Sequence, residues 1–120
     1  MIAYCFHSVE GYSKVGSYKG NAQGPEGTFV YTEFRPSFLL LKNIDSTESW
    51  WMIDDKRDTY NPEEHHIRPN DSSAEYTGSD IADFVSNGFK LRDSDGAWNG
   101  SATYIYLAFA AYPFKYAPAR

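Results

Sequence analysis

Cysteine is almost absent from this 120-residue chain, whose one thiol, Cys5, rules out an intrachain disulfide. The thiol lies in the apolar run IAYCF, so we expect it to be buried. Long apolar runs are also missing. None approaches the ~18 residues of a transmembrane helix, and residues 1–30 lack the basic and apolar regions of a signal peptide. We therefore expect the chain to fold in a reducing cytoplasm.

Positive charge is scarce as well. Lys and Arg number 11 against 16 Asp and Glu, which gives a net charge of −5 at pH 7. Nucleic acids and anionic membrane surfaces attract proteins with a basic field. The charge balance therefore argues against a nucleic-acid partner and against membrane binding or insertion.

Aromatic residues, in contrast, are abundant: ten Tyr, eight Phe and three Trp make up 18% of the chain. Aromatic side chains favour strands, and Tyr and Trp are enriched in binding surfaces. Hydrophobic residues amount to 42%. This content and length fit a single domain over residues 1–120 that buries its own core without disulfides or metal.

Strand patterns dominate the chain. Residues 37–54 predict a hairpin, Asn87-Gly88 marks a turn, and residues 80–86 fit either one helical turn or an extended segment. The run IAYCF resembles IYLAF at 105–109, so residues 1–10 supply either a first strand or a strand carried over from a preceding unit. Strands are expected at 2–9, 14–18, 28–34, 37–43, 50–54, 89–93 and 102–112.

This spacing predicts an all-β fold, an antiparallel β-sandwich of jelly-roll or lectin-like type with about eight strands and little helix. A barrel is the alternative. The apolar runs leave either strand face open as the buried one. The core is expected to include Phe38, Leu40, Phe89, Leu91, Ile105, Leu107 and Phe109.

The segment NIDSTESWWMIDD places two tryptophans side by side on a predicted strand. Successive side chains of a strand point to opposite faces, so Trp50 and Trp51 cannot share one environment. We expect one indole in the core. The other should be buried by the long polar segment 55–80 or by a neighbouring chain, because the apolar run before it indicates that both faces are covered.

Two clusters could bind a metal. Adjacent His65 and His66 point apart on regular structure and lack the ligand spacing of a zinc site. Asp93 and Asp95, with Asn99, lack the full spacing and the terminal Glu of an EF-hand. A solvated loop and a β-turn are the favoured interpretations, and metal binding stays open at both places.

Catalysis has no clear signature. Neighbouring acids such as Asp54 and Asp55 face opposite sides of a strand, whereas glycoside hydrolysis needs two carboxyl groups across one bond. The chain has no nucleophile elbow and no phosphate-binding loop. We expect a protein that is not an enzyme and needs no cofactor.

The predicted ligand site lies in the loops. Trp98 stands between glycines in DGAWNGS, where an indole at a loop tip has little core to join. Other aromatic and polar loop residues could stack on sugar rings and bond their hydroxyls. The candidate ligand-binding residues are Trp98, Tyr60, Tyr76, His65, His66 and Asn99.

Four motifs in a fixed order carry a resemblance that covers nearly the whole chain: GSYKGN, GPEGTFVYTEFRPSFLLLK, DSTESWWMIDDKRDTYNP and DFVSNGFKLRDSDGAWNGSATYIYLAFAAYPFKYAPAR. Together they resemble a domain that recurs in tail-fibre and other tail-associated proteins of marine bacteriophages. In that family a small residue, often Gly, stands where this chain has Glu33. The histidine doublet and Trp98 are individual to this chain.

The resemblance implies a receptor-binding module of lectin-like sandwich type, located in the virion and trimeric in its parent fibre. It supplies no catalytic residues. We expect the partners to be a bacterial surface glycan or receptor, other phage tail proteins and further copies of the chain. A purely structural fibre domain is the alternative function, and a polysaccharide depolymerase is the third.

Overall fold

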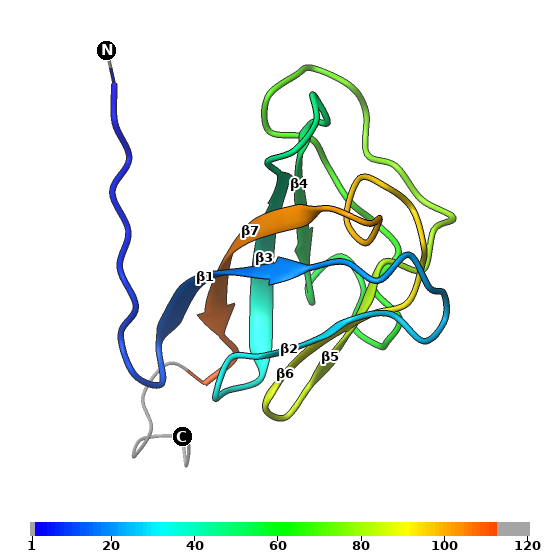
Figure 1. Ribbon diagram of the computed structural model, residues 1–120. Coiled ribbons are helices and arrows are strands. Elements are labelled where there is room, and N and C mark those ends of the chain that lie inside the picture. Colours follow the sequence, from blue (N-terminus) through cyan, green and yellow to red (C-terminus); the bar gives the residue numbers. More distant parts are fainter. Residues whose placement is uncertain (1, 113–120) are drawn as a thin grey trace.

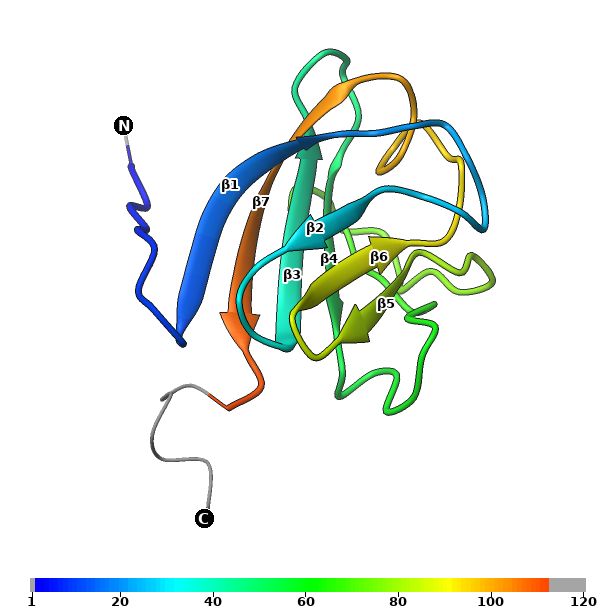
Figure 2. The same ribbon diagram turned by 60° about the horizontal axis from the view of Figure 1, so that its bottom comes forward.

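The computed structural model describes residues 2–112 and forms two antiparallel sheets packed face to face (Figures 1 and 2). Met1 and residues 113–120, the end of the last quoted motif, lie outside the described residues. The larger sheet has the order β1-β7-β3-β4, with β1 Ser13–Lys19, β7 Thr103–Ala110, β3 Pro36–Asn43 and β4 Trp50–Asp54. The smaller has the order β2-β6-β5, with β2 Phe29–Tyr31, β6 Gly88–Leu91 and β5 Ala82–Val85.

This arrangement confirms the predicted antiparallel β-sandwich, and no described residue lies in a helix. The expected hairpin of residues 37–54 is formed by β3 and β4, in register with Leu41 opposite Trp51. Residues 82–85, which fitted either a helical turn or an extended segment, form strand β5. It pairs with β6 through a tight turn that ends at Gly88. A Cβ at Gly88 would lie 2.0 Å from the Val30 carbonyl oxygen, so only glycine fits there.

The core lies between the two sheets. In β3 the inward residues are Leu39 and Leu41, and in β7 they are Tyr104, Tyr106 and Ala108. The continuous apolar runs left both faces open. In the structure the inner face is the one opposite to Phe38, Leu40, Ile105, Leu107 and Phe109, which were expected in the core. Of these five, only Leu107 is buried, although it lies on the outer face. The smaller sheet contributes Phe84, Phe89 and Leu91, of which Phe89 and Leu91 were expected.

Two core tyrosines attach the 93–101 loop to the sheet. Tyr18 and Tyr104 stack with ring centroids 5.0 Å apart. The Tyr18 hydroxyl donates to the Trp98 carbonyl at 2.6 Å, and the Tyr104 hydroxyl donates to the Gly96 carbonyl at 2.6 Å. Burial raises the pKa of both hydroxyls, so they remain neutral donors that satisfy carbonyls inside the loop.

The outer face of the larger sheet is also apolar, because residues that pair across strands share a face. Leu107 of β7 lies between Val15 of β1 and Leu40 of β3, and Leu40 in turn pairs with Met52 of β4. Trp50 extends this face at the end of β4, opposite Lys42. The sheet therefore presents apolar side chains on both sides, although the second sheet covers only one of them.

The N-terminal residues differ from expectation. Residues 2–8 belong to neither sheet and run as an extended segment beside β1 (Figure 1). The prediction of a strand at 2–9 is therefore wrong for this domain, since only Val9 bridges to Ser13. The predicted burial of Cys5 is wrong as well, because the thiol is exposed. Both predictions relied on apolar composition, which indicates a segment suited to burial but does not supply a partner.

Glu33, where the resemblance described above implies a small residue, has an unfavourable backbone conformation. Its φ of 72° lies in the left-handed region, which costs a residue with a Cβ roughly 1–2 kcal/mol and glycine almost nothing. The Lys14 ammonium lies 3.4 Å from the Glu33 carboxylate. A small residue or Gly at this position of the turn would relieve the backbone.

The alternation of β3 gives a testable stability contrast. Leu39→Ala should lower the free energy of unfolding by about 2–5 kcal/mol, because Leu39 is fully buried and leaves a cavity. Leu40→Ala, one residue away on the half-covered outer face, should cost less than half as much. Urea unfolding followed by circular dichroism measures both, and equal losses would contradict the assignment of faces.

Candidate functional site

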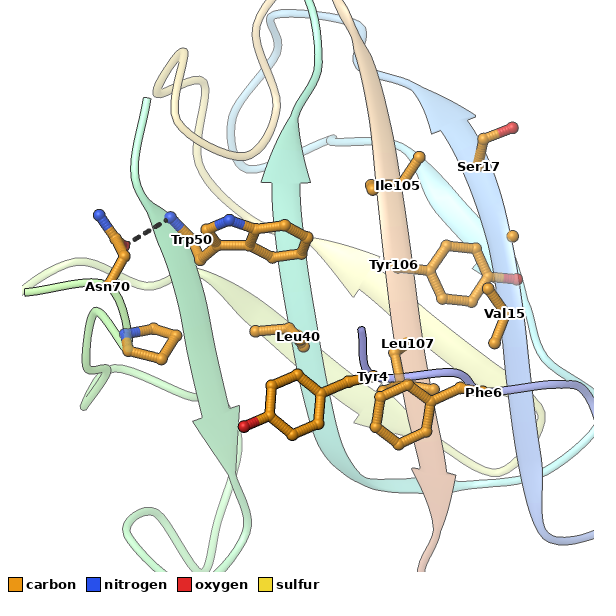
Figure 3. Close-up of a pocket in the computed structure, with 12 residues that line it drawn as sticks. Tyr4, Phe6, Val15, Ser17, Leu40, Trp50, Asn70, Ile105, Tyr106 and Leu107 are labelled. Carbon is orange, nitrogen blue, oxygen red and sulfur yellow. Dashed lines mark hydrogen bonds between the residues drawn. The ribbon is translucent and has the colours of Figure 1, made fainter. Parts of the chain in front are cut away.

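A groove of about 780 Å³ lies on the outer face of the larger sheet (Figure 3). Its lining contains no charged residue, although the chain as a whole carries a charge of −5. The floor comes from β1, β3 and β7, and the sides come from Tyr4 and Phe6 of the N-terminal segment and from Pro69 and Asn70 of the 55–80 segment. Such a volume lies within the ~300–1,000 Å³ typical of ligand pockets.

Trp50 supplies the largest aromatic surface of this groove. Its side chain projects from β4 across Leu40 (Figure 3), and it remains 36% exposed. The backbone N–H of Trp50 donates to Asn70 Oδ1 at 3.0 Å, which holds the Asn70 amide against the β4 backbone at the edge of the groove. The groove thus combines a flat aromatic face with a positioned amide group. Sequence reasoning assigned Trp50 no ligand role, because a β-strand indole was expected to be covered.

Trp51 points the other way and joins three structural units. Its ring centroid lies 5.0 Å from His66, 5.8 Å from Tyr76 and 5.5 Å from Trp98. The Arg68 guanidinium covers this cluster, 4.7 Å from the Tyr76 ring centroid and 5.4 Å from that of Trp51, in cation–π geometry. Segment 55–80 therefore covers a tryptophan as predicted, but the covered indole is the core one.

We expected both indoles to be buried, and the single chain buries only one of them. Trp51 is buried, whereas Trp50 stays partly open on the outer face. The reason is geometric: residues 66–67 bond to the edge of β4 through reciprocal Met52–Ile67 backbone bonds of 2.9 and 3.1 Å. His66 therefore lies on the inner side of the sheet with Trp51. The following residues, Pro69 and Asn70, reach only the edge of the groove and leave the Trp50 indole partly exposed. Cover by a neighbouring chain stays a prediction.

Three of the predicted ligand-binding residues are buried. Trp98 is 3% exposed, and its ring packs edge-on against Trp51 and His66. The expectation of an exposed indole at a loop tip is therefore wrong. Flanking glycines let the 93–101 loop fold back onto the sheet, so the indole finds a core that the local sequence does not reveal. His66 stacks on half-buried Tyr76 at 5.5 Å.

Asn99 is buried for a structural reason. Its Nδ2 donates to the carbonyls of Gln23 and Asp93, both at 2.9 Å, and its Oδ1 accepts from the Asn21 N–H at 3.2 Å. One amide thus holds the 20–27 loop against the 93–101 loop. Asn99 has no polar group directed toward solvent, since the residue is completely buried. Tyr60, in contrast, is exposed and contacts none of the aromatic cluster.

The histidine doublet separates as predicted for adjacent residues. His65 Nδ1 lies 2.6 Å from Asp58 Oδ1, while Asp58 Oδ2 accepts from the backbone N–H groups of Glu64 and His65. The hydrogen bond to Asp58 raises the pKa of His65, and burial lowers that of His66. His66 Nδ1 lies 2.8 Å from the Glu64 carbonyl oxygen. Because a carbonyl oxygen only accepts hydrogen bonds, Nδ1 carries the proton of this bond.

Metal-ligand geometry occurs once among the described residues, at Asp58, Glu64 and His65, whose candidate ligand atoms lie within 4.8 Å of one another. The Asp58 oxygens already take part in three hydrogen bonds of the loop, so folding of the loop accounts for the cluster. Asp93 and Asp95 belong to no such group. Their Oδ1 atoms accept backbone N–H bonds from Asp95 and Ala97, which is the β-turn chemistry favoured above.

Glu63 is a feature that the sequence did not reveal. The residue is 1% exposed, and neither carboxyl oxygen has a hydrogen-bond partner among residues 2–112. Burial, reinforced by the charges of Asp58 and Asp55, raises its pKa to about 8. Its backbone pairs with Ala82 and Ile81 of the smaller sheet, so the strand pairing, rather than the side chain, places a neutral carboxylic acid in the interior.

The fold and these contacts define the class of protein as an all-β sandwich with loops packed over one end and an open aromatic groove on its larger sheet. The chain belongs to a family described as a domain of unknown function, DUF7483, whose family model matches residues 1–113. No curated protein and no solved structure matches the chain. Within residues 2–112, none of the chain forms a helix long and apolar enough to cross a membrane.

The burial of the aromatic cluster predicts that Trp98 and Trp50 contribute unequally to the stability of the fold. Trp98→Ala should lower the free energy of unfolding by about 3–5 kcal/mol, because it empties a buried site beside Trp51. Trp50→Ala should cost much less, since that indole is partly exposed. Urea unfolding monitored by far-ultraviolet circular dichroism compares the two. A Trp98→Ala variant as stable as the wild type would show that the cluster does not support the fold.

Glu63 predicts a pH dependence. Its pKa in the folded state is raised, so the unfolded state loses the proton first as pH rises above the ordinary value of 4.5. Its contribution to stability is full below that value and falls between pH 4.5 and 8, by at most about 1.4 kcal/mol per pH unit. Glu63→Gln should flatten this part of the stability–pH curve, whereas Glu64→Gln should leave it unchanged. An unaltered curve for Glu63→Gln would contradict the assignment.

Proposed function

We propose that this protein is a non-catalytic module of a bacteriophage tail fibre that binds a host-surface glycan through the groove around Trp50. The observation that carries the proposal is a partly exposed indole in an uncharged groove whose edge also holds the Asn70 amide. Indole faces stack on the C–H surfaces of sugars, while an amide bonds their hydroxyls. The tail-fibre assignment rests on the order of the sequence motifs.

The arrangement of aromatic residues supports this groove over the loop site first expected. A sugar needs an accessible ring face, whereas the rings of Trp98 and His66 are buried against each other in the interior. The groove offers Trp50 together with Tyr4, which projects from the N-terminal segment toward the same side of the sheet (Figure 3). Weak binding at one such site would be multiplied when several copies act together in a fibre.

A purely structural fibre domain is the second candidate. It is favoured by the scarcity of polar groups in the groove, where Ser17 and Asn70 stand among mostly apolar side chains. Interfaces between chains of one assembly have such apolar centres. On this alternative the groove would be filled by protein and would bind no sugar.

Binding to host cells separates the two candidates. Trp50→Ala should reduce binding of the labelled protein to host cells or to a glycan array at least tenfold, because the stacking surface is lost. Tyr60→Ala is the matched control, as this exposed tyrosine lies outside the groove. Unfolding curves of both variants verify that the fold persists. Equal binding by Trp50→Ala and wild type would refute the groove as the receptor site.

A further inference from the structure

The N-terminal segment 2–8, here called the arm, has the composition of a strand but no sheet to join. It carries no formally charged Asp, Glu, Lys or Arg side chain. Ile2 and Tyr4 are 80% and 82% exposed, and Phe6 is more than half exposed. Soluble proteins rarely leave a contiguous apolar segment in water unless it binds something. The arm is therefore an interaction element whose partner must be sought.

The arm forms hydrogen bonds with its own domain at its base. The Ser13 hydroxyl donates to the His7 carbonyl at 2.9 Å, and the Val15 N–H donates to the Ser8 hydroxyl at 3.0 Å. Phe6 reaches the outer face, where its ring lies 6.3 Å from Phe109. Gly11, with φ of 72°, forms the turn between arm and β1, so the direction of the arm depends on one short connection.

The surface beside the arm is complementary to it. Tyr4 and Phe6 already line the groove on the outer face, with Val15, Leu40 and Ile105 as its apolar floor (Figure 3). Strand β1 is the last strand of its sheet. The chain's own Val9 and Ser8 already bond to Ser13 and Val15 at the start of this edge, so it is the part of the edge beyond Val15 that can take an added strand. An uncharged arm and an uncharged groove also allow two copies of an acidic chain to meet without bringing like charges together.

The apolar area matches an interface between two chains. A covered aromatic side chain buries about 150–250 Å². The exposed parts of Tyr4 and Phe6, together with those of Ile2, Val15 and Ile105, therefore supply much of the apolar area within the roughly 800 Å² that each partner contributes to a standard interface. In a single copy Ile2 and Tyr4 stay 80% and 82% exposed, because the arm touches the groove from one side.

We propose that the arm of one copy seats on the groove and β1 edge of a second copy, so that Tyr4 and Phe6 complete the groove in trans. If two copies each place their arm on the other, the assembly is a dimer. If each of three copies places its arm on the next, the assembly is a trimer. The inference goes beyond glycan binding, since it concerns assembly and not a sugar. The two can fail separately, because Trp50→Ala tests the sugar and arm variants test the mass.

Light scattering of the full chain tests the exchange. The wild type should have the mass of a dimer or trimer at micromolar concentration. Phe6→Asp should be monomeric, because a charge cannot enter the apolar groove, while Tyr60→Asp, at an exposed tyrosine outside it, should assemble like the wild type. Circular dichroism and thermal unfolding verify that each variant is folded. A monomeric wild type, or an assembled Phe6→Asp, would overturn the proposal.

Mixing two defective variants distinguishes exchange from an arm that acts only on its own chain. Phe6→Asp keeps the floor of the groove on β1, β3 and β7 intact, and Ile105→Asp keeps the arm intact. If Ile105→Asp does not fold, Val15→Asp takes its place, because both side chains are exposed on the outer face. Each variant alone should be monomeric, and the mixture should form one-to-one pairs, more weakly than wild type because one contact replaces two. No pairing at about a hundredfold the concentration at which wild type assembles would overturn exchange.

Discussion

The edge-to-face contact between Trp51 and Trp98 is the interaction on which the rest of the structure depends. It joins the end strand of the larger sheet to the 93–101 loop, and His66 and Tyr76 extend the same cluster into the 55–80 segment. Each of these loops is long and polar, so neither could form a core alone. Packed around one indole, they share a single apolar interior and become part of the sandwich.

Polar bonds then fix what the aromatic contact brings together. The Tyr104 hydroxyl accepts a hydrogen bond from the Gly100 N–H and donates one to the Gly96 carbonyl, both in the 93–101 loop. Asn99 connects that loop to residues 20–27. These groups are buried, so their hydrogen-bonding capacity must be met inside the protein. The loop residues that seemed suited to a ligand by their chemistry are thereby used for folding. Glu63 is an exception, a buried acid that has no partner among the described residues and is neutral at pH 7. The indole N–H groups of Trp51 and Trp98 have no hydrogen-bond partner among these residues either.

On the outer face of the larger sheet, in contrast, apolar side chains remain partly exposed. The larger sheet has apolar side chains on both sides, but residues 2–112 form only one further sheet to cover them. The arm and the loop at Pro69–Asn70 border the uncovered side without closing it. An antiparallel sheet that faces water usually alternates with polar residues. Its apolar outer face departs from that pattern, and on the proposals above a glycan, a fibre chain or a second copy would cover it.

The sequence by itself determined the fold class and most strand positions. Alternation, turn residues and the pairing of residues 37–54 depend on neighbours along the chain, and β4 at Trp50–Asp54 was predicted with its bounds. Opposite directions for Trp50 and Trp51 followed from strand geometry alone. Only the tertiary structure decided which face of an apolar run is buried, that Trp98 joins the core and that the arm leaves the sheets. These outcomes depend on segments distant in the chain, such as β4 and the 93–101 loop, and local patterns hold no information about the partner that a side chain will meet.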